Sequence, residues 1–291
     1  MGKSLVSVLC CLALVCAFTA CSRSGNSENK AVVSLQIKGS DTMVNLGQAW
    51  AEKYTKLHPD VNIGVTGGGS GTGFASLLNK TCDIAMSSRS VEAKEIAKAK
   101  EEKMEFAEQQ VGLDGLAVVV NPASGISKLT IPELRDIFMG TKTNWKDFGG
   151  KDAKIVLLSR ESNSGTHVFF KEHVLKLGKS KGPEEFSPKA LLMPSSQAIS
   201  DEVAQNSSAI GYFGMGYISK KHTVIAVAKD KKSEYLIPTM ENVKTGKYPI
   251  SRPLFLCVTD STNVNIKSFL DFAVSAEGQA VVKELDFVPF K

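Results

Sequence analysis

The segment GGGSGTG, residues 67–73, follows a β-branched, strand-like stretch at 61–65 and precedes a short helical one that runs to Leu78. Two similar segments, GSDT at 39–42 and SNSGT at 162–166, also stand between an apolar stretch and a segment of helical periodicity. The start of a helix offers unpaired backbone N–H groups and the positive end of the helix dipole, which attract anions. Glycine allows close approach of the backbone, and Ser and Thr add hydroxyl donors. Three such junctions predict a site that surrounds a small oxyanion with hydrogen bonds.

Apolar periodicity around these segments predicts alternating strands and helices. Strands are expected at 32–37, 61–65, 83–86, 116–120, 155–158, 209–214, 224–227 and 254–258. Helices are expected at 43–57, 74–78, 91–104, 264–274 and 277–285. A further helix is expected to begin at a capping box formed by Thr130 and Glu133, and another to contain Phe170, Val174 and Leu177 on one face. This order predicts an α/β fold with largely parallel sheets.

The glycine and hydroxyl segments divide between two halves of the chain. GSDT, GGGSGTG and the SSR segment at 87–89 precede the apolar strand at 116–120, and SNSGT follows it. Ligands of open α/β sheets bind beyond the carboxyl ends of strands, where all four segments are expected. A site assembled from both halves predicts two lobes that close on a ligand.

Composition limits the classes of function. The chain has 291 residues, of which 43% are hydrophobic and 22% charged, with a formal net charge of +5. This is the profile of a soluble globular protein, large enough for one domain or two lobes. No Lys/Arg block of the nucleic-acid-binding kind is present, so we expect no nucleic acid as a partner.

The N-terminal segment is typical of an export signal. A basic start is followed by an apolar run to Phe18, too short for an ordinary membrane span. The small residues before Cys21 resemble the lipobox of bacterial lipoproteins, in which the cysteine carries the lipid. We expect residues 1–20 to be a lipoprotein signal peptide, Cys21 to be lipidated, and 21–31 to form a flexible tether. The alternative is plain secretion after cleavage nearby.

Cysteine and histidine spacing indicates no metal. Cys82 and Cys257 lie in apolar surroundings that predict strands and buried free thiols, with extracytoplasmic pairing left open. No Cys/His set has zinc spacing, and the four histidines show neither triad nor metal spacing. We therefore expect no metal, no other cofactor and no catalytic residues.

Glycine-rich loops also hold nucleotides, but 67–73 lacks the residues that this requires. A Walker A loop has Lys after its last glycine, where this chain has Phe74. The dinucleotide pattern G-x-G-x-x-G fails at the same position. The nucleophile elbow G-x-S-x-G fails around Ser70, because Thr72 stands where its second glycine belongs.

An anion-binding site accounts for the same residues better. The candidate donors are the hydroxyls of Thr42, Ser70, Ser164 and Thr166, the backbone N–H groups of Met43 and Gly165, and the guanidinium of Arg160. Arginine forms bidentate, charge-assisted bonds with oxyanions. The alternative is that these residues are only N-caps and turn glycines.

The chain resembles the phosphate-binding protein family of bacterial Pst-type ABC importers, which are class II periplasmic binding proteins. The resemblance spans nearly the whole mature chain. The segments on which the resemblance rests are GSDTM 39–43, TGGGSGTG 66–73, DIAMSSR 83–89, GLDGLAVVVNP 112–122, SRESNSGT 159–166, AIGYFGMGY 209–217, YPISRPL 248–254 and SAEGQAVV 275–282.

This resemblance implies two α/β lobes joined by two crossover strands, near 116–121 and 250–256. Residues 32–117 with 254–291 would form lobe one, and 118–253 lobe two. It also implies a phosphate site made by Thr42, Met43, Ser70 and the position of Ser88 in lobe one, and by Arg160, Ser164, Gly165 and Thr166 in lobe two.

The chain departs from some members of this family at Ser88. Those members have an aspartate there, which accepts a proton of phosphate and disfavours sulfate. A hydroxyl repels sulfate far less than a carboxylate does. Asp41 could supply the missing carboxylate or cap a helix start, and Arg89 could face the anion or pair with a nearby acid.

The resulting expectation is a monomeric, lipid-anchored receptor that binds inorganic phosphate outside the cytoplasm and delivers it to an ABC permease in the inner membrane. Two alternatives remain at this point: a receptor for another tetrahedral oxyanion such as sulfate or molybdate, and a secreted phosphatase that uses the same residues to hold phosphate.

Overall fold

The computed structural model describes residues 32–179 and 182–290, which belong to one compact unit. The expected signal peptide at 1–20 and the tether at 21–31, with Cys21, lie outside the described residues.

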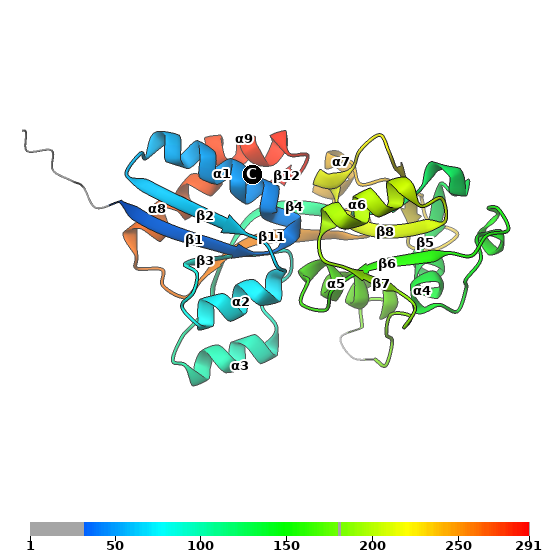
Figure 1. Ribbon diagram of the computed structural model, residues 1–291, viewed down its shortest axis with the longest axis horizontal. Helices are drawn as coiled ribbons and strands as arrows, with labels where there is room; N and C mark the ends of the chain where they lie inside the picture. The colour runs from blue at the N-terminus through cyan, green and yellow to red at the C-terminus, as the bar shows by residue number, and fades with distance from the viewer. Residues whose placement is uncertain (1–31, 180–181, 291) are drawn as a thin grey trace, which may run out of the picture. The chain divides into compact units, whose positions relative to one another are not determined.

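Strands and helices alternate along the chain in the predicted α/β manner (Figure 1). The first half carries β1 (Val33–Gly39), α1 (Val44–Leu57), β2 (Val61–Thr66), α2 (Ser70–Leu78), β3 (Ile84–Ser87), α3 (Ala93–Glu101), β4 (Ala107–Val120), β5 (Lys128–Thr130) and α4 (Ile131–Met139). The second half carries β6 (Val156–Arg160), α5 (Gly165–Phe170), β7 (Leu191–Met193), α6 (Ser196–Gln205), β8 (Ala209–Gly214), β9 (Thr223–Val224), β10 (Ala226–Ala228), α7 (Met240–Lys244), β11 (Ser251–Val258), α8 (Val264–Val274), α9 (Ala276–Glu284) and β12 (Val288–Pro289).

One sheet runs through both halves in the strand order β2-β1-β3-β11-β4-β8-β6-β7. The sheet is continuous because the long strand β4 extends into both halves. Its residues 107–115 pair with β11, and its residues 116–120 pair with β8. Figure 1 shows α1 and α9 on one side of the first part of this sheet and α2 and α3 on the other, so the helices enclose it in layers. The fold is thus of the two-lobed type with two crossover strands, β4 and β11.

The expectation of largely parallel sheets holds only toward the two ends of the strand order. β1 pairs in parallel with β2 and β3, and β6 pairs in parallel with β7 and β8. β11 is antiparallel to β3 and β4, and β4 is antiparallel to β8. The chain crosses between the halves in opposite directions in β4 and β11, so these central pairings are antiparallel.

Helix α1 forms because its apolar residues recur every three or four positions. Leu46, Trp50 and Tyr54 are at most 2% exposed, so one face of the helix packs into the core. The indole N–H of Trp50 donates to the carbonyl of Gly278, which attaches α1 to α9 from the far end of the sequence. The predicted capping box is also present: the Thr130 hydroxyl accepts from the Glu133 N–H, and the Glu133 carboxylate accepts from the Thr130 N–H.

Two of the elements that differ from their predicted extents show a clear physical reason. β4 begins at Ala107 rather than at 116, because its polar and glycine-containing first part is held by pairing with β11 rather than by apolar periodicity. The helix predicted through Leu177 is wrong at its end. α5 passes into a π-helical turn at Lys171–Leu175, and Leu177 is 46% exposed with a φ of 54°. The wider turn shifts the helical phase by one residue and removes Leu177 from the buried face.

Both predicted cysteines are buried free thiols, Cys82 at 8% and Cys257 at 0% exposure. They belong to a small apolar cluster with Phe74 and Ala85. Burial raises the pKa of the Cys82 thiol to about 12 and raises that of Cys257 as well, so both remain protonated at neutral pH. Cys257 lies in β11, whereas Cys82 lies just before β3 rather than in a strand.

Candidate functional site

Four short segments meet where the two halves of the chain come together. GSDT leaves the end of β1, GGGSGTG leads into α2, SSR follows the end of β3, and SNSGT lies between β6 and α5. Because β1 and β3 are parallel neighbours, their carboxyl ends lie at the same edge of the sheet. The helix starts of α2 and α5 add backbone N–H groups that have no acceptor within their own helices.

Hydroxyl groups from both halves are in direct contact at this point. The Thr42 Oγ1 and Thr166 Oγ1 atoms are 2.9 Å apart, and those of Ser70 and Ser88 (Oγ) are 3.4 Å apart. We call Thr42, Ser70, Ser88 and Thr166 the hydroxyl cluster. Gly165 lies against its second pair: a Cβ atom there would be 2.3 Å from Ser70 Oγ and 2.8 Å from Ser88 Oγ. Residue 165 can therefore have no side chain in this arrangement.

The hydroxyl cluster is shielded from solvent. Its four residues are at most 1% exposed, and Ser40 and Ser164 beside it are 2% exposed. Burying polar groups is costly unless they are hydrogen-bonded, and here the hydroxyls bond to one another. The structure thus shows a closed arrangement around a small polar centre.

Asp41 joins the halves beside this centre. Its carboxylate accepts from Arg160 Nη2 at 2.6 Å and from the Gly68 N–H at 3.0 Å, and its backbone carbonyl accepts from the Tyr217 hydroxyl at 2.7 Å. The predicted alternatives for Asp41 were a carboxylate for the anion or a helix-start cap. In the structure this carboxylate bridges Arg160 and the glycine loop.

The guanidinium of Arg160 is 1% exposed and largely committed to protein acceptors. Besides Asp41 it donates to the carbonyls of Met193 and Pro194 and to the Ser196 hydroxyl. An arginine has five N–H donors, and these four contacts leave one on Nη1. In this closed arrangement, then, Arg160 has one donor left rather than a bidentate pair.

The loop SNSGT makes a further junction between the halves. Asn163 Nδ2 donates to the carbonyl of Gly68 at 2.9 Å and to the Thr72 hydroxyl at 3.1 Å, and the Gly71 N–H donates to the Asn163 carbonyl at 3.0 Å. Ser164 caps α5 through a 3.4 Å contact from the His167 N–H. Asn163 had not been singled out from the sequence.

The remaining predicted residues have identifiable contacts. The Met43 N–H donates to the Ser40 carbonyl at 3.0 Å. Ser88 accepts from the Ser40 hydroxyl at 2.9 Å, and its own N–H donates to Ser70 Oγ at 3.1 Å. These bonds fix the orientation of both Ser88 and Ser70 within the hydroxyl cluster.

Arg89 pairs with acids. Its guanidinium donates to both oxygens of Glu95, at 2.8 and 2.7 Å, lies 3.1 Å from Glu92 Oε2, and rests over the ring of Phe74. Of the two predicted alternatives for Arg89, this is the pairing one.

A second buried arginine at the centre was missed from the sequence. Arg252 in β11 is 1% exposed, and its Nη2 donates to Thr42 Oγ1 at 3.2 Å and to Thr166 Oγ1 at 3.0 Å. Its counter-ion is Asp114, the residue directly opposite on β4, with Oδ2 at 2.7 Å from Nη2. The segments GLDGL and SRPL contain both residues, but nothing local in them shows that the two pair.

Burial dominates the electrostatics here. It lowers the pKa of the Arg252 guanidinium, an effect that the Asp114 carboxylate opposes. It raises the pKa of Tyr217 to about 12, helped by Asp41, so this hydroxyl stays protonated as a donor. Burial also lowers the pKa of His167, which favours the neutral form of its ring.

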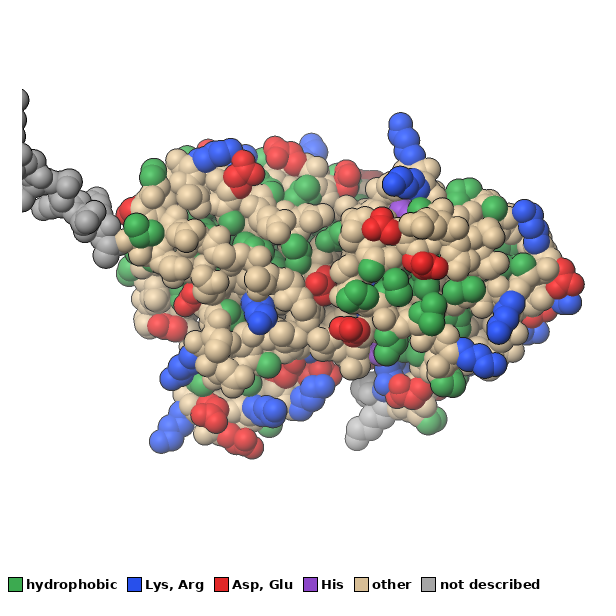
Figure 2. Space-filling view, in the orientation of Figure 1, with side chains coloured by type: hydrophobic (Ala, Val, Ile, Leu, Met, Phe, Trp, Pro, Cys, Tyr) green, Lys and Arg blue, Asp and Glu red, His purple; other side chains and the backbone are tan. Residues whose placement is uncertain are grey.

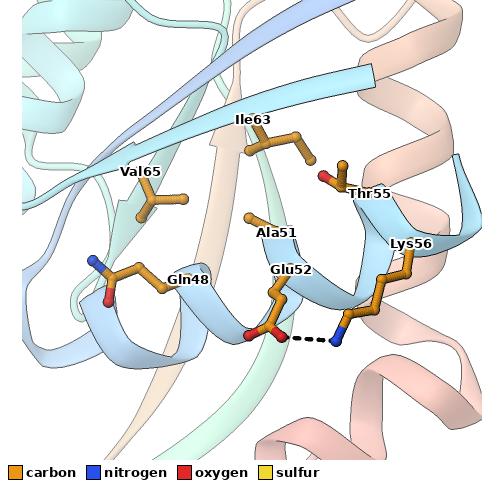
Figure 3. Close-up of a pocket in the computed structure, with 7 residues that line it drawn as sticks. All are labelled: Gln48, Ala51, Glu52, Thr55, Lys56, Ile63 and Val65. Carbon is orange, nitrogen blue, oxygen red and sulfur yellow. Dashed lines mark hydrogen bonds and ion pairs between the residues drawn. The ribbon is translucent and has the colours of Figure 1, made fainter. Parts of the chain in front are cut away.

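A hollow elsewhere in the described residues lacks convergent donors. Figure 3 shows it between α1 and β2, lined by Gln48, Ala51, Glu52, Thr55, Lys56, Ile63 and Val65. Its lysine pairs with Glu52, and both side chains are 71% exposed, so the pair is weak. Figure 2 shows basic and acidic side chains intermingled over the visible face, without a large patch of one sign. The convergent donors of the site are instead in the buried centre.

Within the described ranges, no group of three or more His, Cys, Asp or Glu side chains could hold a metal ion. The chemistry that the centre offers is hydrogen-bond donation from hydroxyls, helix starts and two arginines. These donors suit a small oxyanion.

A sheet continued through two lobes by β4 and β11, with a buried polar centre between them, defines the two-lobed solute-binding proteins. Residues 24–277 match the family model described as a PBP superfamily domain. The phosphate-binding protein PstS of Bacillus subtilis is 34% identical over 270 residues, covering 92% of this chain and 84% of the relative. PstS of Pseudomonas aeruginosa is 32% identical over 274 residues, covering 88% and 83%. The chain belongs to this family of phosphate-binding proteins within the PBP superfamily.

Solved structures of phosphate-binding proteins also match the fold of this chain. A substrate-binding protein from Clostridium perfringens, assigned to a phosphate ABC transporter and solved with bound phosphate, matches with a TM-score of 0.79 and 30% identity, covering 89% of this chain and all of that one (100%). An ABC-type phosphate transport receptor from Vibrio cholerae matches with a TM-score of 0.69 and 30% identity, covering 87% and 99%.

Proposed function

We propose that this protein is the extracytoplasmic substrate-binding component of an ABC importer and that it binds inorganic phosphate between its two lobes. The observation that carries the proposal is the hydroxyl cluster, because Thr42 and Ser70 from one half face Thr166 and Gly165 from the other. The names of its relatives and the phosphate-bound structure of one of them support phosphate as the ligand.

The proposed ligand residues are Thr42, Met43, Ser70, Ser88, Arg160, Ser164, Gly165 and Thr166. In the closed arrangement the Met43 N–H is bonded to Ser40, so its use for phosphate requires a local shift. Arg89 is left out of this set, because Glu95 and Glu92 hold its guanidinium. We assign residues 32–117 and 254–291 to lobe one and 118–253 to lobe two.

Phosphate has to enter while the lobes are apart, since the centre is enclosed. Hinge closure around a ligand is the usual motion of periplasmic binding proteins. The contacts of Asp41 with Arg160 and of the glycine loop with Asn163 would re-form when the lobes close. A bound anion would add its own bonds to these contacts and so favour the closed state.

We infer that binding is not followed by chemistry. The relatives are named as binding proteins and transport receptors, not as enzymes. A phosphatase would need a nucleophile with a general base, or a metal. A chromogenic phosphate-ester assay separates the two functions, and turnover by the purified chain would favour the phosphatase.

We further propose that Cys21 carries a lipid, that the mature protein is a monomer, and that it delivers phosphate to a permease in the inner membrane. The sequence before Cys21 supports the anchor. Over the described residues, no helix is long and apolar enough to cross a membrane. Mass spectrometry of the protein from membranes would detect the acyl chains on Cys21, and an unmodified N-terminus would contradict the anchor.

Calorimetric titration with phosphate and with sulfate tests the proposed function. We expect a phosphate Kd of about 1 µM, equivalent to about −8 kcal/mol, which several charge-assisted hydrogen bonds can supply. Absence of heat with both ions would overturn the function.

Another oxyanion is the second candidate. Ser88 supports it, because a neutral hydroxyl stands where some family members have a carboxylate that repels sulfate. Tight binding of sulfate or molybdate with weak binding of phosphate would favour this second candidate.

A further inference from the structure

Arg252 is a buried arginine beside the hydroxyl cluster whose guanidinium is only partly used. Nε and Nη2 donate to Asp114 Oδ2, at 2.9 and 2.7 Å, and Nη2 also reaches the hydroxyls of Thr42 and Thr166. Nη1 is buried and has no hydrogen-bond partner. An unsatisfied buried donor on a charged group is costly, so its presence beside a polar centre indicates a missing acceptor.

The position of this guanidinium is fixed by the fold. Arg252 and Asp114 are paired residues of the antiparallel strands β11 and β4. Asp114 is itself held by the Met215 N–H, which donates to Oδ1 at 2.9 Å. The Arg252 guanidinium also lies over the ring of Phe169, 5.5 Å from its centroid. The side chain is therefore immobilised on the strands that connect the lobes, next to both threonines.

Arg252 also determines whether the threonine hydroxyls act as hydrogen-bond donors or acceptors toward a ligand. A hydroxyl that accepts a bond from a guanidinium keeps its own hydrogen for donation. Nη2 has two hydrogens, and with one directed at Asp114 Oδ2 the two threonine hydroxyls share the other. In the closed arrangement one of these hydroxyls also donates to the other. An oxyanion between the lobes would compete for these hydrogens.

The serines of the hydroxyl cluster are oriented in the same way. Ser70 accepts from the Ser88 N–H, and Ser88 accepts from the Ser40 hydroxyl. The nearby carboxylates are already engaged, Asp114 by Arg252 and Met215 and Asp41 by Arg160 and Gly68. The centre thus presents donors, without a free carboxylate to accept a proton from the ligand.

We propose that Arg252 binds the anion directly through Nη1 and, by holding Thr42 and Thr166 as donors, makes the site selective for the most deprotonated tetrahedral oxyanions. This proposal rests on the proposed function, since it concerns the same site. Phosphate binds as its dianion in preference to its monoanion, and sulfate, which carries no proton, is a strong competitor.

Calorimetry with matched variants tests the role of Arg252. Arg252→Lys keeps a cation for Asp114 but removes Nη1, and we expect a loss of phosphate affinity of about 30-fold or more. In the control Asp114→Asn, Arg252 and its free donors remain, and affinity should stay within about tenfold of the wild type. An Arg252→Lys affinity within about threefold of the wild type would overturn the proposal while leaving the proposed function intact.

The pH profile tests the donor character of the site, and a merely structural arginine would not produce it. The titratable groups whose charges act on Arg252 are Asp114, Arg160 and Tyr212. Arg160 in turn pairs with Asp41 and acts on His167. From about pH 6 to about pH 8, where a phosphate group loses its second proton, phosphate affinity should rise while sulfate affinity stays level. A phosphate affinity that falls with pH, or sulfate binding about 1,000-fold weaker than phosphate binding, would contradict a donor-only site.

Should Arg252→Lys fail to fold, the wild-type protein decides the question. In a crystal structure with phosphate, Nη1 is expected within about 3.2 Å of a phosphate oxygen. Phosphate bound elsewhere in the cleft, with Nη1 still unpaired, would overturn the role of Arg252 only. A wild-type protein that binds neither phosphate nor sulfate would overturn the proposed function and this proposal together.

Discussion

Arg160→Ala is expected to lower phosphate affinity by about 10²- to 10³-fold. The substitution removes a buried cation beside the centre and leaves the Asp41 carboxylate with the Gly68 N–H as its remaining side-chain contact. The loss therefore combines a ligand donor with the contact that holds Asp41 and the glycine loop against lobe two. Calorimetry measures the affinity, and thermal unfolding checks that the chain remains folded.

Asp41→Asn is the matched variant for Arg160. It removes the charge from the Asp41–Arg160 contact but preserves an oxygen for the Gly68 N–H, so a smaller loss is expected, of about tenfold. If Arg160→Ala binds phosphate as tightly as the wild type, Arg160 does not belong to the site. Equal losses in both variants would assign Arg160 to lobe closure alone.

Gly165→Ala is expected to reduce phosphate affinity by at least about 100-fold, because a 1 Å displacement in a preorganised site can have an effect of this size. The added Cβ would lie 2.3 Å from Ser70 Oγ and 3.0 Å from Ser70 Cβ, so either the serine moves or the lobes stay apart. Stability should change little, since alanine favours the first turn of α5 more than glycine does.

Gly246→Ala provides the opposite pattern as a control. Gly246 has a φ of +67° and open space around its would-be Cβ, so alanine there is strained without touching the site. We expect a loss of stability of about 1 kcal/mol and unchanged phosphate affinity. Normal phosphate binding by Gly165→Ala would show that the ligand does not require the close approach of residue 165 to Ser70.

The parts of the site that were predicted from the sequence depend on local chemistry. A glycine or hydroxyl residue at the start of a helix has the same donors wherever the helix packs, so Thr42, Ser70 and Gly165 could be proposed without a structure. The order of strands and helices followed from periodicity in the same way. The family resemblance then indicated that these loops meet between two lobes.

The parts that were missed depend on contacts distant in sequence. Arg252 and Asp114 are separated by 138 positions and become partners only when β11 pairs with β4. Asp41 and Arg160 were each noticed, but their contact across 119 positions was not. The end of the helix at Leu177 was wrong for a different reason, because the π-helical turn breaks the period on which the prediction relied.

The position of phosphate in a crystal of the wild-type protein tests the central claim most directly. We expect one anion enclosed between the lobes, with its oxygens about 2.6–3.2 Å from the hydroxyls of Thr42, Ser70 and Thr166 and from the Gly165 N–H. Density for phosphate only outside this centre, or a centre that stays empty at saturating phosphate, would contradict the account.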